Sequence, residues 1–182
     1  MMRKFSLSML LLAIASVQAG AQSTAPRPIE LGIDAGVTIG LEDDSFTTID
    51  IPVQAFRIGF PLSPRVSLEP KLRVNMLTGN GTVTNYRGEL GLLYHFGSDR
   101  YPGAYHRAGL YARPFVGIVG FSLDNDDIDE SDSAGLLGAG IGYKLPLVSR
   151  LSSRFEANFA HYFGNGDANE IGLLAGLSFF TR

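Results

Sequence analysis

Apolar and polar residues alternate along most of the chain after its first thirty residues. From Leu31 to Leu41 every odd position is apolar, and the even positions hold only Gly, Asp or Thr. Successive side chains of a β-strand point to opposite faces, so a period of two predicts a strand with one apolar face. A helix would scatter the two sets around its circumference.

The pattern recurs in eight segments: 31–41, 49–60, 66–76, 84–96, 109–120, 137–145, 151–159 and 171–179. Most are about ten residues long, the length that a tilted strand needs to cross the hydrocarbon core of a membrane. Strands of soluble proteins average about five or six residues. The alternation therefore predicts an all-β fold, a transmembrane antiparallel up-and-down barrel of eight strands.

Two irregularities are expected in these strands. The second segment slips by one position at Ala55 and Phe56, which predicts a β-bulge there. Pro52, Pro70 and Pro114 fall inside predicted strands, although a closed barrel has no free edge that could accommodate a missing N–H. We expect these prolines at rims or bulges.

The connections between the segments differ in charge according to their order. The connections after the odd segments contain acids and no Lys or Arg: Glu42, Asp43, Asp44, Asp124, Asp126, Asp127, Asp129, Glu130, Asp132, Asp167 and Glu170. The even connections and the termini contain Arg27, Arg65, Arg100, Arg107, Arg150 and Arg182, with Glu30 and Asp99. Odd connections share one rim of an up-and-down barrel, so this polarisation favours a protein fixed across a membrane, with acidic connections outside and both termini in the periplasm.

Aromatic residues near the segment ends fit the same interpretation. They are Phe46, Phe60, Tyr94, Phe96, Tyr143, Phe163 and Phe179. Such rings form girdles at the two membrane interfaces. A secreted, soluble ligand-binding barrel, whose apolar face would point inward, is the alternative.

The first 21 residues have the order of a cleaved signal peptide. Arg3 and Lys4 precede an apolar run that is too short to span a bilayer, and small residues follow, with cleavage expected after Ala21 or Ala19. We expect residues 22–28 to be a short leader and residues 29–182 to be one barrel domain, exported to the cell outer membrane. The chain has no cysteine, so neither a lipid anchor nor a disulfide is expected.

The charge of the chain excludes one class of partner. The net charge is −3, and it becomes −5 once Arg3 and Lys4 are removed, since 13 bases then face 18 acids. A mildly acidic chain without basic clusters argues against nucleic-acid binding.

The mature chain resembles the eight-stranded OmpA/OmpX-type barrels of the outer-membrane protein β-barrel family. The resemblance lies in the segments Glu89–Phe96 (ELGLLYHF), Arg113–Gly117 (RPFVG) and Gly172–Phe180. It implies a monomer that is folded by the barrel-assembly machinery. Family members usually end on an aromatic residue, whereas Thr181 and Arg182 follow Phe180 here.

The polar faces of the predicted strands carry nine charged residues: Glu69, Lys71, Arg73, Arg87, Glu89, Arg113, Lys144, Arg154 and Glu156. An eight-stranded barrel is just wide enough for side chains to fill its lumen, and buried charges must pair or be hydrated. We expect a structural charge network and a role in structure or surface interaction. A narrow porin-like channel is the alternative.

An enzymatic alternative comes from the seventh segment. The stretch from Arg154 to His161 is similar to the strand that carries the catalytic histidine of barrel-type lipid-A deacylases. In that family a serine follows the histidine by two residues, but Phe163 stands there in this chain. Without a hydroxyl, His161 has nothing to activate, so we expect no catalytic residue.

The acids from Asp124 to Asp132 form the most conspicuous local feature. They are Asp124, Asp126, Asp127, Asp129, Glu130 and Asp132. We expect an exposed extracellular loop, and a sharper hypothesis is that divalent cations bridge it to lipopolysaccharide phosphates. The run lacks the glycine of a calcium-binding EF-hand loop, and the three histidines lack metal-ligand spacing, so no metal or cofactor is expected.

Overall fold

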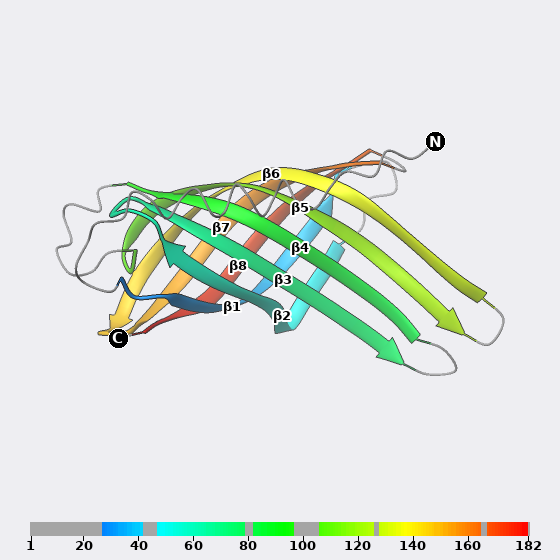
Figure 1. The fold of residues 1–182 in the computed structure, drawn as a ribbon, viewed down its shortest axis with the longest axis horizontal. Helices are drawn as coiled ribbons and strands as arrows, with labels where there is room; N and C mark the ends of the chain where they lie inside the picture. The colour runs from blue at the N-terminus through cyan, green and yellow to red at the C-terminus, as the bar shows by residue number, and fades with distance from the viewer. Residues whose placement is uncertain are drawn as a thin grey trace.

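A computed structural model describes residues 27–41, 47–78, 82–96, 106–125, 128–164 and 167–181. It contains eight strands: β1 (Glu30–Gly40), β2 (Thr47–Pro61), β3 (Val66–Thr78), β4 (Thr82–His95), β5 (Gly109–Asn125), β6 (Ile128–Val148), β7 (Leu151–Phe163) and β8 (Ala168–Phe180). The predicted all-β fold of eight antiparallel strands is confirmed (Figure 1). The expected signal peptide, residues 1–21, lies outside the described residues.

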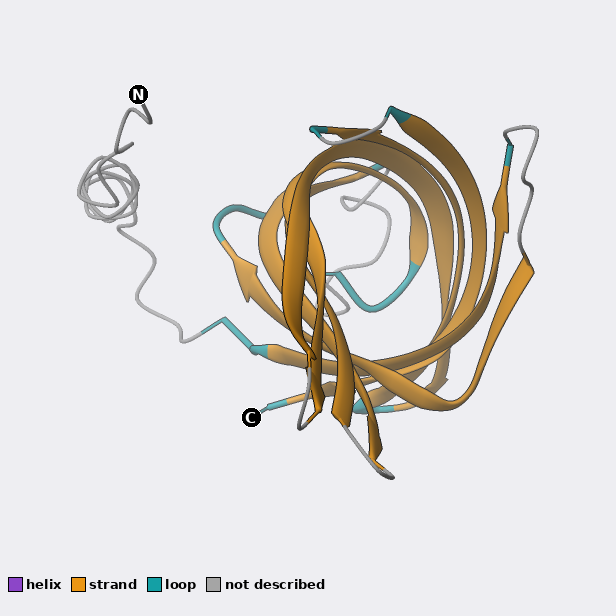
Figure 2. Ribbon diagram, turned by 90° about the vertical axis from the view of Figure 1, so that its right-hand side faces the viewer, coloured by secondary structure: helices purple, strands orange, loops and turns teal. Residues whose placement is uncertain are grey.

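The strands close into a barrel in which each pairs with the next in sequence (Figure 2). Strand β1 closes the ring against β8 in an unbroken antiparallel register from Glu30↔Phe180 to Gly40↔Glu170. Closure leaves no sheet edge, which matters because lipid offers no hydrogen-bond partner to a free backbone group. Among the described residues, no helix is both long and apolar enough to cross a membrane.

The alternation of the sequence becomes an apolar outside and a polar inside. In β5, Val116 and Ile118 are 53% and 60% exposed, whereas the intervening side chains Arg113 and Phe115 are buried. The predicted orientation of the apolar faces is confirmed, and the alternative of a soluble barrel with an apolar interior is wrong.

The expectation of rims or bulges holds for Pro52 and is wrong for Pro70 and Pro114, which lie inside strands of unchanged register where backbone pairing is interrupted. Pro70 pairs with Leu90 of β4, but on its other side the β2–β3 ladder skips from Arg57↔Lys71 to Phe60↔Leu68. A residue without an N–H fits such a position.

Pro114 occupies the equivalent position in β5. It pairs with Ala139 of β6, and the β4–β5 ladder skips from Gly91↔Phe115 to Tyr94↔Ala112. Pro52 lies within the irregularity of the β1–β2 ladder that separates the pairs Asp34↔Ala55 and Gly36↔Asp50, so the predicted bulge lies just before Ala55.

Strands β5 and β6 form a hairpin that is much longer than a membrane crossing requires. They contain 17 and 21 residues, against roughly ten for a tilted crossing strand. In Figure 1 this hairpin, together with the β3–β4 hairpin, extends beyond the other strands at one end of the barrel.

The expected extracellular loop from Asp124 to Asp132 is therefore corrected. Asp124 lies in β5, and Asp129, Glu130 and Asp132 lie in β6, with Asp124 paired to Asp129. Asp126 and Asp127 lie outside the described residues. Between Asp124 and Asp132 both faces of the hairpin meet water, so apolar and polar residues no longer alternate. The sequence pattern therefore does not reveal the strands, although their backbone pairing continues.

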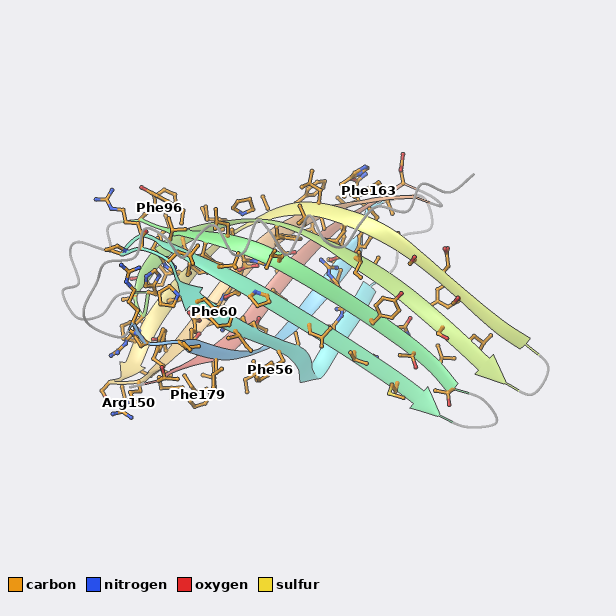
Figure 3. The ribbon with its side chains drawn as sticks, in the orientation of Figure 1. Phe56, Phe60, Phe96, Arg150, Phe163 and Phe179 are labelled. Carbon is orange, nitrogen blue, oxygen red and sulfur yellow. The ribbon has the colours of Figure 1, made fainter. Side chains whose placement is uncertain are left out.

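Aromatic side chains gather mainly at the end of the barrel that carries the C-terminus. Phe60, Phe96 and Phe179 lie towards that end together with Arg150, and Phe163 lies towards the other (Figure 3). All four phenylalanines are 39–49% exposed on the outer surface. The arrangement suits rings that sit at headgroup level. Phe46 lies outside the described residues.

We expect the substitution Leu173→Arg to destabilise the barrel strongly in lipid. Leu173 is 60% exposed and lies midway between Asn169 and Phe179 on the outer face of β8. A charge at the bilayer midplane costs about 2–4 kcal/mol. Urea unfolding in vesicles measures this loss, and Ser153→Arg, near the aromatic end, should cost only about 0–1 kcal/mol. Equal costs at both positions would contradict the assigned membrane depth.

Candidate functional site

The centre of the lumen is built around Arg113, which reaches acids on both sides. Its guanidinium donates to Glu156 Oε1 at 2.9 Å and to Glu89 Oε2 at 2.9 Å. Arg154 donates to Glu156 and to Glu69 Oε2 at 2.5 Å. All five side chains point inward because each occupies a polar position of its strand, and all are buried.

A second part of the network, from β1 and β2, was missed by sequence reasoning. The Arg57 guanidinium donates to Asp34 Oδ1 at 3.0 Å and also contacts Glu30. Lys144 donates to the other oxygen of Glu30. The assignment of Glu30 to the periplasmic rim is wrong, since it is 3% exposed inside the barrel. The slip at Ala55 and Phe56 was a signal for Arg57, because it turns Phe56 outward and therefore Arg57 inward.

A third part lies nearer the end with the long hairpins. Arg87 donates to Glu89 at 2.6 Å and to Glu170 at 2.8 Å, and Tyr162 donates to Glu170. The assignment of Glu170 to an outer connection is wrong, because it lies in β8 and is 4% exposed. Its alternation signal was hidden by the neighbouring polar Asn169.

The structure brings together eight of the nine predicted lumen residues in this network. Lys71 completes it at 3.5 Å from Asp34. Arg73, the ninth, also faces inward and is half-buried, and it lines both the small inner cavity and the wider opening beyond. Tyr111, which donates to Glu156 at 2.8 Å, is a further member that the sequence did not reveal.

The charges of the described lumen balance. Six buried carboxylates (Glu30, Asp34, Glu69, Glu89, Glu156, Glu170) face five buried cations (Arg57, Arg87, Arg113, Lys144, Arg154) and Lys71, whose side chain is 10% exposed. Desolvated ions are stable only when paired and hydrogen-bonded, and this balance provides that. The ring of strands can therefore bury charge without net charge.

The lumen leaves little room for solvent. A cavity of about 30 Å³ lies between Asp34, Lys71 and Arg87. That volume holds about two water molecules. Towards the long hairpins, Phe115, Leu136 and Ala160 form an apolar cluster on the wall built by β5, β6 and β7. Ionic side chains therefore fill most of the described lumen, and an apolar cluster covers one wall.

The opposite end is closed by two histidines. Their rings meet edge-on, with centroids 4.3 Å apart. His106 Nε2 lies 2.9 Å from the carbonyl oxygen of Ser63, and His95 Nε2 lies 3.0 Å from Ser67 Oγ. His106 adopts the left-handed conformation, with φ of 63°, which turns its ring into the barrel end.

The Ser67–His95 contact pairs a hydroxyl with an imidazole, as a nucleophile and its base would be paired, but it lacks the surroundings that catalysis needs. His95 is 1% exposed and Ser67 is 3% exposed. Among the described residues, His95 Nδ1 has no hydrogen-bond partner that would orient the ring. A catalytic base needs both an orienting group and access to substrate. His161, the residue of the enzymatic alternative, lies 3.1 Å from Asn169 Oδ1, and Phe163 is exposed on the outer surface.

The described residues contain no group of three or more His, Asp or Glu side chains that could hold a metal ion. At the end with the long hairpins, a wider cavity of about 490 Å³ opens to solvent. Asp132 is one of its lining residues, with Arg73 and Glu170.

A closed ring of eight strands, apolar towards the outside and ion-paired within, defines a transmembrane β-barrel. Residues 7–179 match the outer membrane protein beta-barrel domain family, so the chain belongs to that family and is an outer-membrane β-barrel. No curated protein matches the chain significantly in sequence.

Two solved bacterial proteins share this fold. Neisserial surface protein A superposes with a TM-score of 0.58 and 14% identity, over 83% of this chain and 96% of that one. Ail, the attachment invasion locus protein of Yersinia pestis, gives a TM-score of 0.53 and 12% identity, over 86% of this chain and 100% of its own. At these identities the likeness concerns the fold alone.

We expect Arg113→Met to cost about 3–5 kcal/mol of unfolding free energy, because Glu89 and Glu156 are buried and each then keeps only one of its two cations. The double variant Arg113→Met with Glu156→Gln removes one of those charges and should recover part of the loss. Urea unfolding in detergent micelles measures both, with exposed Arg150→Met as control. A loss as small as that of the control would contradict a paired lumen.

The histidine closure should loosen in acid. Burial, together with the positive charge of Lys144, lowers the pKa of His106 from 6.5 to about 4. A lowered pKa favours the neutral ring in the folded state, so its contribution is complete above pH 6.5 and is lost as the pH falls towards 4. The protection factors of the amides at residues 106–108, which are exchange rates corrected for the intrinsic effect of pH, should fall over that range.

His106→Gln removes the titrating group and serves as the control. Its exchange rates should change with pH only as the intrinsic chemistry of exchange requires. The same acid-dependent opening in this variant would assign the effect to other groups.

Proposed function

We propose that this barrel is a non-conducting, non-enzymatic surface protein of the outer membrane, which presents its long hairpins outside the cell. Export by the predicted signal peptide and a monomeric barrel folded by the barrel-assembly machinery belong to this proposal. The lumen gives rigidity, and the projecting hairpins give the surface for interaction.

The observation that carries the proposal is the filled lumen. Arg154 of β7 donates to Glu69 Oε2 of β3 at 2.5 Å, and Lys144 of β6 donates to Glu30 of β1, so these contacts cross the space that an ion would need. An ion in transit would have to break such contacts in a region with little water. This supports a structural interior over the narrow channel.

The absence of an enzymatic role is supported by the two histidine settings. His161 has Phe163 where the deacylase pattern needs a serine, and the Ser67–His95 contact is buried at the closed end. Neither arrangement offers an accessible nucleophile.

The projecting hairpins support an interaction role at the cell surface. Their acids, among them Asp124, Asp129 and Glu130, lie beyond the last outward-facing apolar residues of β5 and β6. We propose that divalent cations link these carboxylates to lipopolysaccharide phosphates. Ail of Yersinia pestis has been solved with the heparin analogue sucrose octasulfate, at 11% identity to this chain. The acidic hairpin here would repel such a polyanion.

Planar bilayer recording tests the closed lumen. The purified barrel should insert without steady conductance, because paired side chains fill the pore. The double variant Arg154→Ala with Glu156→Ala removes a buried pair without changing net charge and should give ion leakage. Large steady conductance from the unaltered barrel would defeat the proposal and favour the channel.

A further inference from the structure

The β5–β6 hairpin reverses its polarity where it leaves the membrane. Within the barrel, Val116 and Ile118 face outward and are apolar. Beyond Ile118 the outward positions are Gly120 and Ser122, whereas the inward positions are Val119, Phe121 and Leu123. A strand that turns its apolar side inward while outside the lipid lines a binding space, as in soluble ligand-binding barrels.

A single row of side chains crosses the inner face of this projecting wall. The registers place Asn75 of β3 opposite Asn85 of β4, Asn85 opposite Phe121 of β5, and Phe121 opposite Asp132 of β6. Facing side chains of paired strands lie about 5 Å apart, so the row spans roughly 14 Å. Two amides, an aromatic ring and a carboxylate thus share one surface.

These four residues line the cavity of about 490 Å³ at the outer mouth. Typical small-molecule sites measure about 300–1,000 Å³. The floor is fixed, because Glu170 is 4% exposed and is held by Arg87 and Tyr162. The walls are open, because Phe121 is 36% exposed and the two amides and Asp132 are exposed. An aromatic ring left open to water in a polar concavity is suited to a ligand.

We infer that the outer mouth binds an uncharged saccharide. An amide offers a donor and an acceptor side by side, and a carboxylate offers two acceptors, which matches pairs of neighbouring sugar hydroxyls. The ring of Phe121 provides the apolar surface on which the C–H face of a sugar stacks.

The charges at the mouth argue for a neutral sugar over a sulfated or phosphorylated one. Two carboxylates, Asp132 and Glu170, line the cavity together with the cation Arg73, and Arg87 already donates to Glu89 and Glu170. The lining therefore has no excess of positive charge that would hold an anionic ligand.

This inference rests on the proposed surface role, and a reporter in the cavity tests it. The chain contains no tryptophan, so Phe121→Trp creates a single fluorophore at the centre of the row. In phosphatidylcholine vesicles, titration with maltose or with chitobiose should shift its emission in a saturable manner. Asn85→Ala in the same background should weaken the apparent affinity about tenfold, which corresponds to about 1.4 kcal/mol of lost hydrogen bonding. Phe159→Trp, on the lipid-facing surface of β7, is the matched control and should not respond.

Charged probes separate this proposal from others. A response to sucrose octasulfate alone would show an anion site and overturn the inference. Glucosamine and putrescine both carry positive charge. If both shift the emission while maltose and chitobiose do not, the carboxylates attract cations and the site does not recognise a sugar, which would also overturn the inference. No response to any uncharged sugar by protein that shows the heat-modifiable gel mobility of a folded barrel would also overturn it. The closed lumen and surface role would then still stand, because bilayer recording tests them separately.

The lipid composition of the vesicles distinguishes a sugar of the same membrane from a sugar supplied from outside. In vesicles with lipopolysaccharide that carries its full saccharide chains, a site filled from the same membrane would show shifted emission before any addition and no further change with maltose. An externally supplied sugar would leave the full maltose response intact. Vesicles with lipid A alone provide the baseline for both results.

Discussion

The structure depends on one constraint: every polar group within the lipid must find its partner inside the protein. The backbone satisfies this constraint by closing β1 against β8, and the lumen satisfies it by pairing carboxylates with cations around Arg57, Arg113 and Arg154. The two solutions support each other. Closed strands exclude water from the ion pairs, and the ion pairs fill the space that the strands enclose.

Outside the lipid the same strands follow another rule. Water satisfies the exposed polar side chains of the β5–β6 hairpin, so the apolar side chains Val119, Phe121 and Leu123 turn inward where lipid no longer draws them out. One hairpin therefore has a membrane pattern in its lower part and the pattern of a soluble barrel in its upper part. The interaction surface proposed for the mouth follows from this change of solvent.

The periodicity predicted the strand number, the orientation of the faces and most of the lumen network, because lipid imposes a strict period of two. The periodicity failed where the strands leave the lipid and enter water. Asp124 and Asp132 were taken for a loop because both faces of the hairpin meet water there. The slip at Ala55 and Phe56 already indicated the inward face of Arg57. Glu30 and Glu170 lie at strand ends, where polar neighbours interrupt the alternation and hide the limits of the strand. Which acid meets which base depends on packing across the lumen, which alternation does not encode.

Neighbouring residues on opposite faces allow the most direct test of this account. Phe115 is 2% exposed inside the barrel and Val116 is 53% exposed outside it. Because the chain has no tryptophan, Phe115→Trp and Val116→Trp each carry one fluorophore, and lipids brominated in their acyl chains quench only rings that touch them. The account predicts strong quenching at position 116 and little at position 115. Equal quenching, or the reverse order, would contradict it.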